Sequence, residues 1–237
     1  MTAPQVVIVA GGRGTRLGTL TADVPKFLVP VDGRPFADHV LAMLHEQDVP
    51  SVHFCLGHHA DQVVAHLRER WTSLAWTATV EQEPLGTGGA LRMAIPDLAE
   101  EFVLLLGDTF TPVDFAALSA GFRTSGLPAA MTVMDNDDWL VPSNVRVADG
   151  LVVEYSKHAC PGEFRHVDYG IALLRRDVLQ RLPRDRSADL CELFSSLIAD
   201  RALAALEVPR AQRFYEIGSP EGHAEFTELV RTGGVSA

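Results

Sequence analysis

The sequence predicts a single α/β domain with a mixed, mostly parallel sheet flanked by helices. Two wholly apolar runs, 6–10 and 102–106, are typical of strands buried on both faces of a parallel sheet. Amphipathic helical segments alternate with strand segments, which favours right-handed strand–helix–strand crossovers. With 237 residues, 47% of them hydrophobic, the chain is long enough to bury one full core. We therefore expect a Rossmann-like arrangement, in which ligands bind at the carboxyl ends of the strands.

The first half of the chain shows the clearer periodicity. Phe36, Val40, Met43 and Leu44 share one face of a helix expected over 36–47. The other elements expected in this half are strands over 52–56, 72–80 and 102–106 and a helix over 60–70. The weak alternation of the segment 72–80 places that strand nearer an edge of the sheet.

The second half is less regular. Asp149-Gly150, between two short β-prone runs, predicts a hairpin turn. The elements expected here are strands over 129–134, 145–147, 151–155 and 171–174 and helices over 189–199 and 220–230. Because neither a repeat nor a linker divides the chain, residues 1–237 are predicted to form one domain, with a frayed tail over 232–237.

Composition narrows the classes of partner. A formal net charge of −11 and a pI near 5.2 argue against nucleic acid and anionic membranes, since both require basic surfaces. Cys55, Cys160 and Cys191 are widely spaced without a CxxC pair, so we expect reduced thiols in a cytoplasmic protein. No apolar run approaches the roughly 20 residues of a membrane span.

The most informative stretch follows the first strand. Gly11, Gly12 and Gly14 permit close approach of a ligand to the backbone, and the cations Arg13 and Arg16 share their loop. The loop is not a Walker A motif, because no Gly-Lys-Ser/Thr follows it at the required spacing. It is not a G-x-G-x-x-G fingerprint either, because a fingerprint that starts at Gly12 needs its third glycine at position 17, whereas this chain has Gly18. The residues alone leave two interpretations open: an ordinary glycine turn, or a phosphate site of another kind.

A longer pattern resembles a known family. The run Ala10-Gly11-Gly12-Arg13-Gly14-Thr15-Arg16-Leu17, followed by Val24-Pro25-Lys26, is similar to the signature of the sugar-1-phosphate nucleotidyltransferases. The resemblance implies the fold of the nucleotide-diphospho-sugar transferases. It implies that Arg16 and Lys26 stabilise the transition state. The expected contacts to the nucleotide phosphates are Ala10, Gly11, Gly12, Gly14 and Thr15.

A second glycine-rich segment, 83–90, resembles the part of that family that holds the nucleobase and ribose. The resemblance assigns nucleotide contacts to Gln82, Gly86, Thr87 and Gly88. We expect Gln82 to contact a base edge and the two glycines to pass the backbone close to the base. The alternative is a turn that leads flexibly into a helix.

Two acidic residues are candidate magnesium ligands. Asp108 ends the apolar strand 102–106 in a Gly-Asp motif, and Mg²⁺ prefers carboxylate and phosphate oxygens. In the family the second ligand is an aspartate near the C-terminus, and Glu216 stands at that position here. The alternatives are a turn or N-cap role for Asp108 and a simple helix start after Glu216.

The remaining candidates lie in the second half of the chain and are expected to bind the sugar 1-phosphate, the acceptor of the reaction. Tyr155-Ser156-Lys157 resembles a segment whose lysine binds the sugar phosphate, although Ser156 replaces the usual glutamate. Asp168 and Gly170 align with residues that bind sugar hydroxyls, and Asn144 is a further candidate. We therefore expect residues 1–110 to bind the nucleotide and residues 111–231 to bind the sugar phosphate.

The reaction implied is transfer of a nucleotidyl group from a nucleoside triphosphate to a sugar 1-phosphate, with Mg²⁺ as cofactor. The segments PLGTGGA, DVPK and EIGSPE look most similar to the heptose 1-phosphate guanylyltransferases. A hexose 1-phosphate thymidylyl- or uridylyltransferase, or a non-catalytic nucleotide-sugar-binding module, remains an alternative. The continuation of the loop as Thr-Arg-Leu argues against a molybdopterin-type guanylyltransferase. A homodimer is left open.

Overall fold

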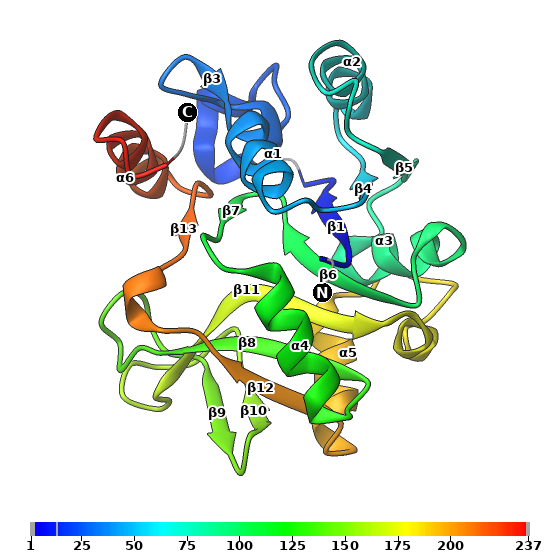
Figure 1. Ribbon diagram of the computed structural model, residues 1–237, viewed down its shortest axis with the longest axis vertical. Coiled ribbons are helices and arrows are strands. Elements are labelled where there is room, and N and C mark those ends of the chain that lie inside the picture. Colours follow the sequence, from blue (N-terminus) through cyan, green and yellow to red (C-terminus); the bar gives the residue numbers. More distant parts are fainter. Residues whose placement is uncertain (1–2, 13, 236–237) are drawn as a thin grey trace.

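The computed structural model describes residues 3–12 and 14–235, which form a nine-stranded sheet with helices on both faces (Figure 1). The strands lie in the order β5-β4-β1-β6-β11-β8-β12-β10-β9. Their bounds are β1 Gln5–Ala10, β4 Val52–Leu56, β5 Trp76–Val80, β6 Glu101–Leu106, β8 Ala129–Asp135, β9 Val145–Ala148, β10 Leu151–Tyr155, β11 His166–Arg175 and β12 Leu203–Glu207. Two short ribbons lie outside this sheet: β2 Pro30–Val31 with β3 Arg34–Pro35, and β7 Thr109–Phe110 with β13 Tyr215–Glu216.

Strand direction divides the sheet. Strands β5, β4, β1 and β6 are mutually parallel, and so are β8 and β12, whereas β11, β10 and β9 pair antiparallel with their neighbours. The predicted mixed α/β sheet is thus confirmed. Parallel pairing dominates only its first half, because β11 enters antiparallel between β6 and β8.

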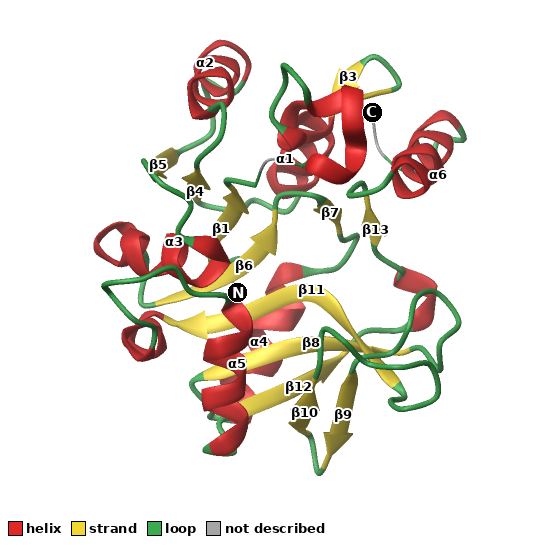
Figure 2. Ribbon diagram, turned by 180° about the vertical axis from the view of Figure 1, so that it is seen from behind, coloured by secondary structure: helices red, strands yellow, loops and turns green. Residues whose placement is uncertain are grey.

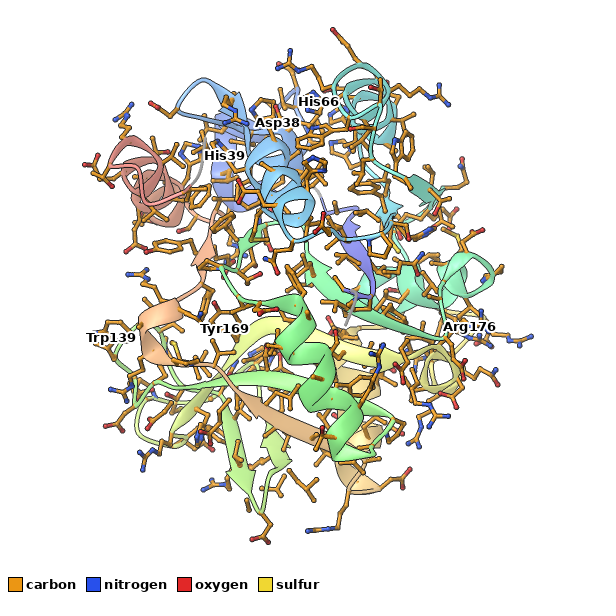
Figure 3. All side chains as sticks on the ribbon, viewed as in Figure 1. Asp38, His39, His66, Trp139, Tyr169 and Arg176 are labelled. Carbon is orange, nitrogen blue, oxygen red and sulfur yellow. The ribbon has the colours of Figure 1, made fainter. Side chains whose placement is uncertain are left out.

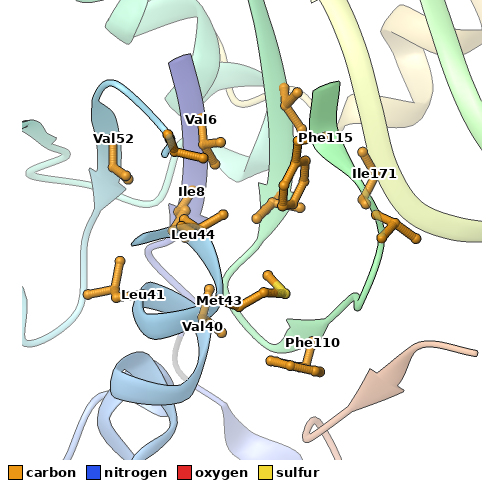
Figure 4. Packing of buried hydrophobic residues seen from close by; sticks show 14 of the residues in the cluster. Val6, Ile8, Val40, Leu41, Met43, Leu44, Val52, Phe110, Phe115 and Ile171 are labelled. Carbon is orange, nitrogen blue, oxygen red and sulfur yellow. The ribbon is translucent and has the colours of Figure 1, made fainter. Parts of the chain in front are cut away.

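Helices cover both faces of the sheet (Figures 1 and 2). One apolar cluster contains residues of α1 Phe36–Glu46, α2 Ala60–Arg70, α4 Phe115–Ser125 and α6 Pro220–Arg231, and the other contains residues of α3 Gly86–Ala94 and α5 Leu190–Ala199. Val6 and Ile8 of β1 belong to the first cluster and Val7 to the second, as strand alternation requires. Figure 4 shows Val6 and Ile8 beside Leu41 and Leu44 of α1.

A buried carboxylate ties α1 to α2. Oδ1 of Asp38 lies 2.7 Å from Nε2 of His66 and accepts a 2.7 Å hydrogen bond from the indole N–H of Trp71. Figure 3 shows Asp38 and His66 at the facing sides of the two helices. A buried carboxylate is costly unless it is hydrogen-bonded, and these two partners satisfy it.

Some boundaries differ from those predicted. Strand β5 begins at Trp76 rather than at residue 72, because residues 71–74 form a turn in which the N–H of Leu74 bonds to the Trp71 carbonyl at 3.2 Å. Strand β11 begins at His166, five residues before the predicted start, and has a bulge between Asp168 and Ala172. Helix α4 and strand β12 were not predicted.

The hairpin and the tail give opposite outcomes. The hairpin is confirmed, since β9 and β10 pair around Asp149 and Gly150, whose φ angles are 52° and 73°. The tail does not fray at residue 232, because the N–H of Gly234 bonds to the Leu229 carbonyl at 3.0 Å and Val235 packs against the core. Residues 236–237 lie outside the described residues.

Within the described residues, no helix is long and apolar enough to cross a membrane. The three cysteines, Cys55, Cys160 and Cys191, are free thiols, as their spacing predicted.

The carboxyl ends of β1 and β6 lie at one edge of the sheet. Val9 pairs with Leu106, and the N–H of Gly107 donates a 2.9 Å hydrogen bond to the Val9 carbonyl. The glycine loop and Asp108 leave the sheet at this edge, as the sequence predicted. The ribbon β7–β13 then brings a C-terminal segment to the same place.

We expect Phe226→Ala to lower the free energy of unfolding by about 3–5 kcal/mol, because it removes a large buried ring. Phe226 is fully buried, and its ring centroid lies 5.3 Å from that of Phe36 and 5.0 Å from that of Phe110. Phe226→Leu, which keeps much of the volume, should cost about 1 kcal/mol. Urea unfolding of both variants measures the difference, and equal losses would contradict this role of the ring.

Candidate active site

The glycine loop folds back onto Lys26. Gly14 has a φ of 63°, and a Cβ there would lie 3.0 Å from Thr21 Cγ2 and 3.2 Å from Lys26 Cβ, so only glycine fits without strain. The Thr21 hydroxyl donates a 3.0 Å hydrogen bond to the Gly14 carbonyl. The 3₁₀ segment Thr15–Thr21 thereby closes the loop and carries Arg16. Arg13 lies outside the described residues.

Four chain segments bring two cations and two carboxylates together. Lys26 Nζ pairs with Asp108 Oδ2, and Arg16 Nη2 pairs with Glu216 Oε1 at 3.2 Å. Asp108 and Glu216 are held side by side, because Glu216 pairs with Thr109 across β7–β13 and the N–H of Ile217 donates to the Asp108 carbonyl at 2.8 Å. The predicted catalytic cations and metal ligands therefore form one cluster.

The residue that makes room for this cluster is Gly218, which was not among the predicted site residues. A Cβ on Gly218 would lie 2.5 Å from Glu216 Oε1, 2.9 Å from Lys26 Nζ and 3.1 Å from Arg16 Nη2. Any side chain there would enter the cluster. The pattern Glu216-Ile217-Gly218 contained the signal, but the glycine was interpreted only as part of a helix start.

Two adjoining cavities lie over the ends of β1 and β6. Their volumes are about 350 and about 260 Å³, and Val9, Gly12 and Thr87 line both. Of the predicted residues, the first is lined by Gly11, Gly12, Gln82, Gly86 and Thr87, and the second by Ala10, Gly12, Gly14, Thr15, Arg16, Lys26, Thr87 and Asp108. Every residue predicted to contact the nucleotide, except Gly88, lies in the wall of one of them.

Gly86 and Gly88 of α3, which are predicted to approach a base closely, both lie against the segment 187–189. A Cβ on Gly88 would lie 3.0 Å from the Asp189 carbonyl, and one on Gly86 would lie 2.5 Å from the Ala188 carbonyl oxygen. The N–H of Gly88 also donates to the Ala188 carbonyl at 3.0 Å. Their missing side chains let α3 pack tightly on residues 187–189. Gly86 still lines the first cavity.

Three acceptor candidates share one hydrogen-bonded turn. The backbone N–H of Asp168 donates to Asn144 Oδ1 at 2.8 Å, and the N–H of Gly170 donates to Asp168 Oδ1 at 2.9 Å. Gly170 has a φ of 90°, which favours glycine. Tyr169, between them, is fully buried, and its hydroxyl donates to the Gln212 carbonyl. Figure 3 shows Tyr169 within the body of the molecule.

Lys157, the fourth acceptor candidate, is held by a residue that was not predicted. Its Nζ lies 2.8 and 2.9 Å from the two carboxylate oxygens of Asp189. Asp189 also caps α5, since its Oδ1 accepts the N–H of Cys191 and its own N–H donates to Glu192. The sequence signal was the D-x-x-E pattern of a capping box before an apolar run.

The carboxyl of Asp168 has an unusual acidity. Burial raises its pKa to about 6, while hydrogen bonds from the Gly170 N–H and the Tyr155 hydroxyl and the charge of Lys157 act to lower it. The folded protein therefore holds this proton more tightly than the unfolded chain, whose aspartates have pKa values near 3.9. Its contribution to stability falls as pH rises from about 4 to about 6.

The residues present fit a magnesium ion. Asp108 and Glu216 place two carboxylates in one cluster, and Mg²⁺ is usually held by one or two carboxylates with water and substrate phosphates. Among the described residues, no group of three His, Cys, Asp or Glu side chains could enclose a metal. A metal here would depend on oxygens from a phosphorylated ligand.

We expect the Asp168 carboxyl carbon to titrate near pH 6 in ¹³C NMR, with Asp168→Asn identifying its signal. Tyr155→Phe should raise the pKa further, because it removes a hydrogen bond that favours the carboxylate. A titration near pH 4 in the unmodified protein, or a lower pKa in the Tyr155 variant, would contradict this description of the site.

Known proteins resemble the chain over its length. It is 26% identical over 222 residues to D-glycero-alpha-D-manno-heptose 1-phosphate guanylyltransferase of Campylobacter jejuni, a match that covers 94% of this chain and 98% of that protein. It is 32% identical to the enzyme of the same name from Aneurinibacillus thermoaerophilus, over 46% of this chain and 48% of that protein.

Solved structures show the same fold. HddC from Yersinia pseudotuberculosis, complexed with GMP-PN, superposes with a TM-score of 0.80 at 24% identity and covers 96% of this chain and 99% of that chain. The inositol-1-phosphate CTP transferase of T. maritima gives 0.81 at 18% identity, covering 100% and 99%. Residues 6–212, which contain the glycine loop, both cavities and the acceptor turn, match one family as a unit. The chain belongs to the MobA-like NTP transferase domain family.

Proposed function

We propose that this protein transfers a guanylyl group from GTP to a heptose 1-phosphate, releasing pyrophosphate. The observation that carries the transfer chemistry is the convergence of Arg16, Lys26, Asp108 and Glu216 at one edge of the sheet. The family supports nucleotidyl transfer, and the Campylobacter and Aneurinibacillus relatives support the choice of base and sugar.

The chemistry follows from the charges. An oxygen of the acceptor phosphate forms a bond to the α-phosphorus of the triphosphate, and the bond from that phosphorus to the bridging oxygen breaks. The electron pair leaves with pyrophosphate. Because the nucleophile is already an anion at neutral pH, no general base is needed. The barrier is the approach of two phosphate anions, which Arg16 and Lys26 lower by neutralisation and positioning.

Asp108 and Glu216 would hold Mg²⁺, which when bound supplies positive charge to the phosphate oxygens. These carboxylates pair with Lys26 and Arg16 in the structure. If Asp108 and Glu216 bound Mg²⁺, Lys26 and Arg16 would lose their carboxylate partners and become available to bind phosphate. We therefore expect nucleotide and metal to bind better together than apart.

The first cavity favours guanine through its acidic wall. Glu81 and Gln82 line it, and Glu81 Oε2 accepts the N–H of Leu85 at 2.9 Å. A Cβ on Gly57 would lie 2.7 Å from Glu81 Oε1, so glycine there leaves space for the carboxylate. Guanine presents two adjacent N–H donors on its pairing edge, which a carboxylate can accept together, whereas uracil and thymine present one N–H between two carbonyl oxygens that a carboxylate repels.

The acceptor would lie over the turn that contains Asp168. Asp168 and Asn144 offer oxygens to sugar hydroxyls, and Gly170 leaves space for the ring. Lys157 would release Asp189 and bind the phosphate in its place. The three free thiols support a cytoplasmic location for the protein.

The test is pyrophosphate release with Mg²⁺, across the five common nucleoside triphosphates and a panel of hexose and heptose 1-phosphates. Release with GTP and a heptose 1-phosphate alone is the expected result. Release with UTP or dTTP and a hexose 1-phosphate would replace the proposed substrates with those alternatives. Nucleotide binding without release from any pair would favour a binding module and overturn the proposed transfer.

We expect Gly218→Ala to reduce turnover by about 10²-fold or more, because its Cβ would displace Lys26, Arg16 and Glu216 from one another. Gly121→Ala is the matched control, since a Cβ on that α4 glycine meets only Leu206 Cδ2, at an ordinary 3.4 Å. Steady-state rates and thermal melting are measured for both variants. Equal activity in the two, with equal melting temperatures, would remove Gly218 from the site.

A further inference from the structure

A further cavity, separate from the two over β1 and β6, lies on the outer side of α3 and is lined by three arginines. Its volume is about 500 Å³, and α3, the following 3₁₀ turn and the segment 183–186 form its wall. It contains Arg92, Arg184 and Arg186 together with the apolar side chains of Met93, Ile95 and Pro183. It lies on the sheet face that carries α3 and α5, shown toward the viewer in Figure 2.

The charge of this cavity is unbalanced. No carboxylate is among its lining residues, although the chain as a whole has a net charge of −11; the nearest in sequence is Asp185, between Arg184 and Arg186. Arg186 is paired with Glu192 at 2.6 Å, whereas the side chains of Arg92 and Arg184 make no ion pair or hydrogen bond with the described residues. Nε of Arg92 is buried and has no hydrogen-bond partner. A buried N–H without a partner costs free energy, so an oxygen-rich ligand would be stabilised here.

We propose that this cavity binds a phosphate ester with an apolar body. Guanidinium groups bind phosphate through paired, charge-assisted hydrogen bonds, and two of the three arginines are available for them. Met93, Ile95 and Pro183 provide an apolar wall that inorganic phosphate alone would leave uncovered. This site is separate from the two cavities over β1 and β6, since none of the three arginines lines either of them.

The cavity is connected to the acceptor residues. Arg186 donates to both carboxylate oxygens of Glu192, Glu192 accepts the N–H of Asp189, and Asp189 holds Lys157. A phosphate that competes with Glu192 for Arg186 loosens this chain of contacts. This expectation rests on the proposed function: a ligand bound in the cavity changes the affinity of the protein for the acceptor phosphate.

Binding is tested by calorimetry with phenyl phosphate and the intact protein, without nucleotide. We expect binding in the unmodified protein, a loss on the order of tenfold or more in Arg92→Gln/Arg184→Gln, and a change of only several-fold in Lys157→Met, because coupling between two sites is reciprocal. Unchanged binding in the double variant with loss in Lys157→Met would place the ligand at the acceptor site and overturn the proposal. Inorganic phosphate should bind several-fold more weakly than phenyl phosphate. Equal affinity of the two would contradict the proposed contact of the ligand with the apolar wall. Circular dichroism shows whether each variant is folded.

The connection is tested separately, so that its failure is distinguishable from failure of the cavity or of the proposed reaction. The KM for the acceptor is measured with and without phenyl phosphate. A several-fold change in the unmodified protein that disappears in Arg92→Gln/Arg184→Gln is expected. A change of equal size in both would assign the effect to competition at the active site and overturn the connection.

Discussion

The pairing of Lys26 with Asp108 is the interaction on which the site depends. It joins a residue after the glycine loop to one that follows β6, and the two side chains are only 13% and 22% exposed. The pair of Arg16 with Glu216 is 68% and 44% exposed, so water screens it and it contributes little to stability. The inner pair therefore sets the position of the site, while the outer pair is free to exchange partners.

Distant packing supports this arrangement. Phe27, next to Lys26, is buried with its ring 6.0 Å from that of Phe54, so the lysine begins from a fixed backbone. On the other side, Phe226 holds α6 against Phe110 of β7, and this contact keeps the ribbon that carries Glu216 in place. The site is thus positioned by the first apolar cluster, which extends from the N-terminal strands to the C-terminal helix.

Sequence predicts what is local and periodic here. The buried runs of β1 and β6, helices α1 and α2, and the Asp149-Gly150 hairpin each carry their pattern within a few residues. Strands β7 and β13 could not be found that way, because each is two residues long and exists only by pairing with the other. Gly218 and Asp189 were missed for the same reason: their roles depend on residues far away in the chain.

The candidate cations are paired with carboxylates in the structure, although phosphate binding would require them to be free. Each candidate cation that the structure describes has a carboxylate partner: Arg16 has Glu216, Lys26 has Asp108, and Lys157 has Asp189. Without their carboxylates, Arg16 and Lys26, which both lie beside Gly218, would repel one another. If a phosphate bound Lys157 as proposed, Asp189 would still accept the N–H of Cys191 and cap α5. Exchange at the acceptor side therefore costs only the ion pair and leaves the helix start intact.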